Sequence, residues 1–176
     1  KGLPLGPRPV LQASSRARIL VAGQAPGLKV HNTGLPFNDP SGERLRTWMG
    51  MTRETFYDRA KVLVVPMGFC YPGKGNGGDL PPRRECRETW HERLFKALPK
   101  PKIRLIIGQY AHAYHLRDAA KKTLTETVRA WREFAPEIFP LPHPSPRNIR
   151  WFRKNPWFER ELIPELQRRI SRILEK

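Results

Sequence analysis

"RILVAGQAPG" (residues 18–27) joins a short, uninterrupted apolar run to a turn built from glycine and proline. The run does not alternate apolar with polar residues, so it does not predict a strand with one face in water. Continuous β-branched runs are typical of parallel strands that are buried on both faces. Residues 18–23 are therefore predicted to form a central strand of a parallel sheet.

Other apolar runs extend this pattern along the chain. Runs at 61–68 and 103–108 are also continuous, and a further run lies at 137–142. Segments with helical periodicity lie between and after them, at 41–50, 83–98, 108–116, 123–134 and 156–176. This alternation predicts an α/β fold, a three-layer αβα sandwich with a central, mostly parallel sheet of about four strands. We expect residues 1–176 to form a single domain.

In open α/β sheets, the functional groups collect in loops beyond the carboxyl ends of the strands. The loops after the predicted strands bring polar and aromatic side chains to one rim of the sheet. These are Gln24, Phe37, Asp39, Tyr71, Gln109, His112 and His143.

The loop "LPHPSPRN" (141–148) is stiff, because its three prolines fix the backbone and remove donors. It holds His143 beside Ser145, Arg147 and Asn148, whose donors suit phosphate oxygens. A neutral imidazole in this position can donate a hydrogen bond to an anion that develops on a leaving group. The alternative is a proline-rich turn with an incidental histidine.

The chain is strongly basic. Its 33 Lys and Arg residues exceed its 16 Asp and Glu residues, which gives a formal net charge of +17. Such a field attracts polyanions, and nucleic acid is the predicted partner, with an anionic membrane as the weaker alternative. No run approaches the roughly 18 apolar residues of a membrane span. We expect a monomer of the bacterial-type cytoplasm, associated with the nucleoid and not with a membrane.

"GKGNGG" (73–78) matches a dinucleotide-binding pattern, but two prolines follow it and no acidic residue ends a following strand. We interpret it as a flexible or DNA-facing loop with Lys74 available to phosphates, or equally as a plain surface loop. The histidines lack metal-ligand spacing, so no metal is predicted. His91, His112 and His115 are interpreted as surface or core residues.

Three motifs carry a family resemblance. "GQAPG" (23–27), "TGLPFNDPSG" (33–42) and "HPSPRN" (143–148) follow the expected strands in the expected order. The chain resembles the uracil-DNA glycosylase superfamily over residues 18–160. The resemblance implies an enzyme that flips a deaminated base, uracil above all, out of DNA and breaks its N-glycosidic bond in base excision repair. It implies no cofactor.

The resemblance also implies roles for individual residues. His143 would donate to the departing uracil O2, and Asp39 or Gln24 would orient the water, although Asp39 is alternatively a helix cap. Phe37 would stack on the flipped base, or is a core residue. The turn residues would line the pocket or touch DNA: Gly23, Ala25, Pro26 and Gly27. In the last loop, Ser145 and the neighbouring amides would hold phosphate, Pro146 and Asn148 would also contact DNA, and Arg147 would be the wedge or a further phosphate contact.

The chain departs from the family at the end of the second strand, where relatives usually carry an asparagine that reads the base. In this chain we expect backbone groups of residues 66–70, which include Met67, Gly68 and Phe69, or the side chain of Asn38, to recognise the base. The accepted base therefore stays open among uracil, hypoxanthine, xanthine and thymine.

Two cysteines, Cys70 and Cys86, are similar to the second cysteine pair of the iron-sulfur branch of the superfamily. The first pair is absent from this sequence, so we predict no cluster from the chain as given. Two alternatives to the enzyme are kept. One is a catalytically weak or silent member that binds DNA or abasic sites. The other is a hydrolase of another substrate, although no nucleophile elbow is visible.

Overall fold

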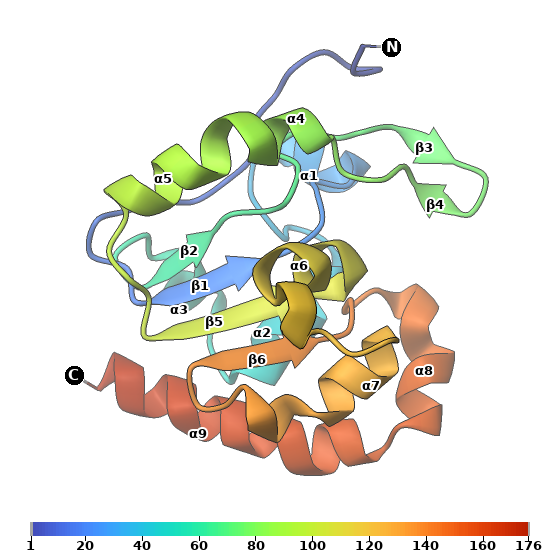
Figure 1. Cartoon of the computed structure of the whole chain (residues 1–176). Helices are drawn as coiled ribbons and strands as arrows, with labels where there is room; N and C mark the ends of the chain where they lie inside the picture. The colour runs from blue at the N-terminus through green and yellow to red at the C-terminus, as the bar shows by residue number, and fades with distance from the viewer. Residues whose placement is uncertain (1, 176) are drawn as a thin grey trace.

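The computed structural model describes residues 2–175, whose centre is a four-stranded sheet in the order β2-β1-β5-β6. Every neighbouring pair in this sheet is parallel, and the arrows in Figure 1 point the same way. The predicted α/β sandwich around a parallel sheet is therefore confirmed. The strands are β1 (Ile19–Ala22), β2 (Val62–Val64), β5 (Ile103–Ile107) and β6 (Ile138–Leu141).

The central strand β1 explains why its sequence is continuously apolar. Ile19 and Val21 pack into the core on one face of the sheet, whereas Leu20 and Ala22 pack into the clusters on the other face. All of these side chains are at most 2% exposed. Because both faces of the sheet are covered at β1, a polar residue at any of these positions would be buried in a core.

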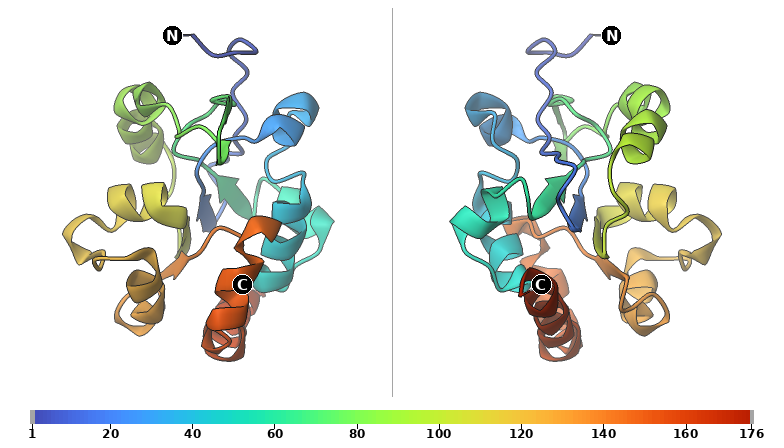
Figure 2. Two further views of the ribbon diagram at one scale, coloured as in Figure 1. Left: turned by 90° about the vertical axis from the view of Figure 1, so that its right-hand side faces the viewer. Right: turned by 90° about the vertical axis from the view of Figure 1, so that its left-hand side faces the viewer.

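Helices form the two outer layers, which Figure 2 shows on either side of the sheet. One face is covered by α2, α3 and the amphipathic α9, which share one core cluster with the sheet. The other face is covered by the segment from α4 to α5 and by α6. The bounds are α2 (Pro40–Met49), α3 (Arg53–Tyr57), α4 (Arg84–Cys86), α5 (Glu92–Ala97), α6 (Gly108–His115) and α9 (Ile163–Leu174).

The remaining elements are short. A π-helical segment (Arg87–His91) joins α4 to α5, and another (Phe158–Leu162) leads into α9, so the predicted helices at 83–98 and 156–176 are nearly continuous. The predicted helix at 123–134 is wrong as one unit, because α7 ends at Arg129 and a separate 3-10 turn covers Trp131–Glu133. Helices α1 (Leu28–Thr33) and α8 (Ile149–Lys154), and 3-10 turns at Arg117–Ala119 and Pro146–Asn148, were not predicted.

Strand β2 is shorter than the predicted run at 61–68. Pro66 has no N–H to donate, and its carbonyl oxygen lies 3.0 Å from Nε2 of the buried His91. Pro66 therefore does not take part in the hydrogen bonding of the sheet. The chain then turns, and the Met67 and Gly68 amides donate to the carbonyls of Gly23 and Gln24, both at 2.9 Å. These bonds tie the loop after β2 to the loop after β1.

The glycine-rich stretch at 73–78 contains a hairpin. Strands β3 (Lys74–Gly75) and β4 (Gly78–Asp79) pair antiparallel through a tight turn. In Figure 1 the hairpin projects at the end toward which β1, β5 and β6 point, and α8 lies at the same end. The chain has thus placed two long loops around the carboxyl ends of the sheet.

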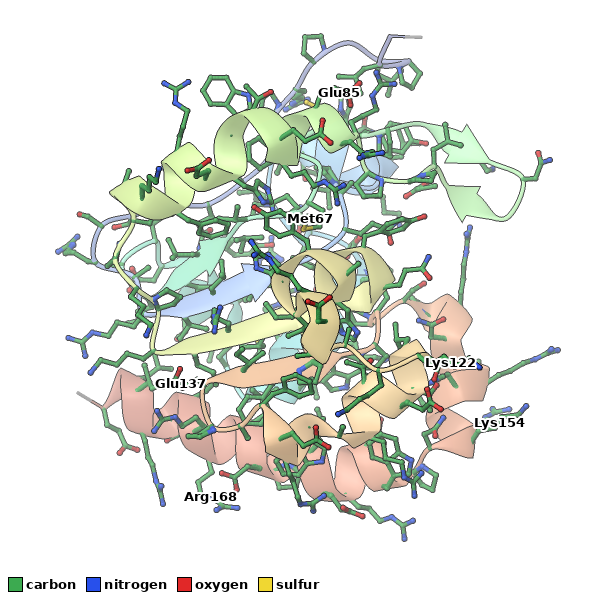
Figure 3. The ribbon with its side chains drawn as sticks, in the orientation of Figure 1. Met67, Glu85, Lys122, Glu137, Lys154 and Arg168 are labelled. Carbon is green, nitrogen blue, oxygen red and sulfur yellow. The ribbon has the colours of Figure 1, made fainter. Side chains whose placement is uncertain are left out.

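Among residues 2–175, no helix is long and apolar enough to cross a membrane. Basic side chains labelled in Figure 3 lie on helices, as Lys154 and Arg168 do, and on the loop before α7, as Lys122 does.

Candidate active site

A cavity of about 420 Å³ opens at the carboxyl ends of the strands, between the loop after β1, the β3–β4 hairpin and the proline-rich loop after β6. Residues from all three sequence motifs line it together. They are Gly23, Gln24, Ala25, Pro26, Gly27, Phe37, Asp39, His143, Ser145, Arg147 and Asn148. The volume lies in the range of ordinary small-ligand pockets.

The turn after β1 lies against the ring of Phe37. A Cβ on Gly23 would lie 3.0 Å from Cζ of that ring, so only glycine lets the ring rest on the turn without a shift. Gln24, the next residue, is half-buried and lines the cavity.

Phe37 is held in an unusual backbone conformation. Its φ is 54°, in the left-handed region that bulky residues rarely adopt. Its carbonyl oxygen accepts a hydrogen bond from Arg46 Nη1 at 3.2 Å, and a Cβ on Gly42 would lie only 1.6 Å from that oxygen. The ring meets Phe56 edge to face at 6.3 Å. Phe37 therefore packs on the core and also presents ring surface to the cavity.

Asp39 caps helix α2. Its Oδ1 accepts a hydrogen bond from the Gly42 amide at 2.8 Å, so the helix begins at Pro40, one residue before the predicted segment at 41–50. The same carboxylate lines the cavity, and no residue in the described range bonds its Oδ2. Asp39 thus combines the capping role with a free oxygen at the site.

His143 is held in one tautomer. Its Nδ1 accepts a hydrogen bond from the Ser145 amide at 3.2 Å, so the neutral ring carries its proton on Nε2. Burial lowers the pKa of the ring, while the nearby charges of Asp39 and Asp79 act in the opposite direction. The net lowering makes His143 a neutral Nε2–H donor near pH 7.

Hydrogen bonds to the backbone fix the proline-rich loop. Arg44 Nη1 donates to the carbonyls of Pro144 and Ser145 at 3.3 and 3.2 Å. Asn148 Nδ2 donates to the His143 carbonyl at 2.8 Å. Across the mouth of the cavity, Arg147 Nη1 donates to the Gly77 carbonyl at 3.2 Å, which links this loop to the hairpin.

Several residues singled out in the sequence lie outside the cavity lining. Met67 is buried within the molecule (labelled in Figure 3), and Phe69 stacks on His91 with ring centroids 5.5 Å apart. Asn38 Oδ1 accepts from Arg53 Nη2 at 2.9 Å. Lys74 and Pro146 are exposed, and Gly68 packs against Pro82.

The backbone groups expected to read the base are already engaged. The Pro66 carbonyl faces His91, and the Met67 and Gly68 amides bond to the turn after β1. Of the predicted rim, Tyr71 is buried with its ring 6.1 Å from that of His31, and Gln109 is exposed elsewhere. His112 is buried with Nε2 3.0 Å from the Ile106 carbonyl.

Sequence reasoning missed Asp79 and Leu80 of the hairpin, which line the cavity. It also missed most of the apolar wall, formed by Val10, Val30, Val64, Pro36 and Pro72, whereas Pro66, which belongs to the predicted 66–70 segment, does line the cavity. The signal available for Asp79 was its place four residues after Gly75 in a stretch that pairs as a hairpin. The charge of Lys74 favours that residue in the same stretch, but Lys74 lies outside the cavity lining.

Cys70 and Cys86 are free thiols, buried and half-buried respectively. Burial raises the pKa of Cys70, the Arg8 backbone amide lowers it, and the neighbouring Cys86 raises it further. A four-thiolate cluster needs twice the cysteines that this sequence contains, so the residues present do not complete such a ligand set. Residues 2–175 hold no group of three or more metal-ligating side chains.

A sequence model of the uracil DNA glycosylase superfamily matches residues 11–167. The matched residues include the whole four-stranded sheet and all three sequence motifs. They also include every residue that lines the cavity except Val10.

Proposed function

The chain belongs to the uracil DNA glycosylase superfamily, and on that premise we propose that it flips uracil out of DNA and hydrolyses the N-glycosidic bond as a monofunctional glycosylase. Membership supports a DNA glycosylase in general. The uracil specificity, the monomeric state and a place on the bacterial nucleoid in base excision repair are parts of our proposal.

The observation that carries the proposal is the convergence of Gln24, Phe37 and His143 on one cavity. These residues come from two loops more than a hundred positions apart in the sequence. The cavity combines an aromatic ring, an amide and a neutral ring donor, which are the groups that a flipped base and its departing charge require.

Phe37 supplies the surface on which the base stacks. Taking a base out of the duplex costs its stacking and pairing, and an aromatic platform restores part of the stacking. The fixed backbone at Phe37 keeps the ring in place before the base arrives, so little ordering is needed on binding.

The reaction follows from the charges that develop. When the C1′–N1 bond breaks, its electron pair leaves with the base, and the Nε2–H of His143 donates to O2 of that anion. The oxygen of a water bonds to C1′. Asp39 Oδ2, or the Gln24 amide, orients that water, and its proton passes to the carboxylate or to solvent.

The basic surface supplies the attraction to DNA. Ser145 and Asn148 would hold backbone phosphate together with Lys74, and Pro146 would contact DNA beside them. Arg147 would leave the Gly77 carbonyl and enter the space vacated by the flipped nucleotide.

One observation favours the alternative, a weak or silent member that binds DNA or abasic sites. Three backbone groups expected to read the base edge, the Pro66 carbonyl and the Met67 and Gly68 amides, are engaged within the protein. An assay of base release separates the two. Incubation with a uracil-containing oligonucleotide and chelator should release free uracil and leave an abasic site. Salt-sensitive binding with no base release at micromolar protein would support the silent member instead.

The same assay defines the base range. Oligonucleotides with hypoxanthine, xanthine or a thymine mismatch, run in parallel, should react more slowly than the uracil substrate. Equal or faster release of another base would replace uracil in the proposal.

A further inference from the structure

Asp79 is a second carboxylate at the candidate site. It ends strand β4 and lines the same cavity as His143. Its Oδ2 lies 3.4 Å from the point that a Cβ on Gly27 would occupy. The carboxylate thus lies over the turn after β1, beside the space that a side chain at position 27 would fill.

The position of Asp79 is built into the fold. The hairpin pairs it with Lys74, and the turn of that hairpin is tied to the proline-rich loop by the bond from Arg147 Nη1 to the Gly77 carbonyl. A Cβ on Gly78 would lie 2.6 Å from that same Nη1, and Gly78 has a φ of 146°, so glycine is the residue that suits this turn. The hairpin therefore carries Asp79 to the mouth of the cavity.

The Asp79 carboxylate has no hydrogen bond or ion pair with any residue of the described chain, including Lys74, which is its register partner. Asp39 differs, because its Oδ1 is bonded to the Gly42 amide. The negative charge of Asp79 reaches His143 and Tyr71, since it acts to raise the pKa of both side chains. Asp79 is exposed, whereas Asp39 is half-buried.

A free carboxylate in this place is unfavourable for simple DNA binding. The rest of the chain attracts phosphate with a net charge of +17, and a negative group at the mouth repels it. A carboxylate is favourable there toward hydrogen-bond donors and, more strongly, toward positive charge. Positive charge develops on the sugar, at C1′ and the ring oxygen, as the bond to the base breaks.

We propose that Asp79 is a catalytic carboxylate that faces the sugar of the flipped nucleotide and stabilises the positive charge formed there. This inference rests on the proposed function. The C1′–N1 electron pair leaves with the base toward His143, the sugar becomes cationic beside Asp79, and water held by Asp39 adds to C1′. Asp79 forms no bond and keeps its charge throughout, so water remains the only co-reactant.

The test compares Asp79→Asn with the wild type in single-turnover release of uracil from DNA. Enzyme is saturating, and the pH is 8, where His143 is neutral in both proteins. We expect a rate loss of about tenfold or more, as loss of a charge-stabilising group at a transition state produces. DNA affinity should stay equal or become tighter, because a repulsive charge is removed.

Asp118→Asn is the matched control. Asp118 is exposed, does not line the cavity and gives the same change in net charge. It should react at the wild-type rate. Asp79→Glu, which keeps the charge, should recover part of the loss, and thermal unfolding should show that each variant is folded.

An Asp79→Asn rate within twofold of wild type at saturating enzyme would overturn the inference while leaving the proposed function intact. A rate loss that disappears at higher enzyme concentration would also overturn it, because it would reflect binding alone. If the wild type itself releases no uracil, the proposed function fails first.

Discussion

The Ser145 amide donates a hydrogen bond to Nδ1 of His143 at 3.2 Å, which leaves Nε2 as the only nitrogen of the neutral ring that carries a proton. Two residues of the same loop thereby fix the direction in which the imidazole donates. The function proposed for His143 depends on this tautomer, and it can be tested in several ways.

Replacement of His143 by alanine should slow uracil release in single turnover by about a hundredfold or more, the usual effect of losing a preorganised donor at a developing anion. The binding of uracil-containing DNA should change little, because the donor acts mainly on charge that appears later. Rates are measured at saturating enzyme after thermal unfolding has shown a folded protein. A rate equal to wild type would remove His143 from the mechanism.

The pH dependence of the reaction rate should report the protonation of the His143 imidazole. Burial lowers the pKa of His143 below its ordinary 6.5, so the ring stays neutral as the pH falls from 8 through 6.5. Protonation below that value places a hydrogen on Nδ1, which can then no longer accept the Ser145 amide bond that orients the ring. The acid limb of kcat/KM should therefore have its midpoint below 6.5. In Asp79→Asn the midpoint should move lower still, since the Asp79 charge opposes the shift. An acid limb centred above 6.5 would contradict this environment for the ring.

Gly42→Ala should destabilise the protein. The added Cβ would lie 1.6 Å from the Phe37 carbonyl oxygen, so either helix α2 or the Phe37 backbone must move. We expect a loss of about 2 kcal/mol or more in the free energy of unfolding, at the upper part of the range for overpacking. Gly77→Ala serves as the stability control, because nothing lies within 4 Å of its Cβ position. Equal denaturation midpoints for the two variants would show that the Phe37 turn is not tightly constrained.

The fold should lose stability in acid through His115. Burial lowers its pKa from 6.5 to about 3, with His91 and Arg104 adding to the effect, and its Nε2 has no hydrogen-bond partner. Between pH 6.5 and about 3 the unfolded chain binds more protons at this site than the folded chain does. Stability is therefore full above 6.5 and falls as the pH drops toward 3, by up to about 5 kcal/mol.

His115→Phe provides the comparison. It keeps a ring in the contacts with Phe95 and Tyr114 and removes the titrating nitrogen. Urea denaturation at pH 7.5, 5.5 and 4.5 should show a shallower loss of stability in the variant than in the wild type. Parallel losses in the two proteins would show that His115 does not carry the acid sensitivity.

Much of the fold follows from local sequence. The run at 18–23 is apolar throughout because both faces of β1 are buried, and this physical rule also identified the strand within 103–108. The length of the second strand was overestimated, because the strand ends where Pro66 contacts His91, a residue 25 positions away. Apolar composition cannot reveal such a contact.

The residues of the candidate site were predictable where a short local motif fixes their position in the fold. Asp39, Phe37 and His143 were found because each follows a strand end beside prolines or glycines. Asp79 was missed because its place depends on the hairpin turn and on the bond from Arg147 to Gly77, which join segments 70 residues apart. Charge alone drew attention to Lys74, whose exposed side chain lies outside the cavity.

The most direct measurement is a crystal structure of the protein bound to DNA that carries one 2′-fluorinated deoxyuridine. The electron-withdrawing fluorine disfavours the cationic sugar and so preserves the intact substrate. Our account predicts an extruded uracil in the cavity, its ring against Phe37 and its O2 within hydrogen-bond distance of His143 Nε2. A uracil that stays stacked in the duplex, or that binds away from these two side chains, would contradict it.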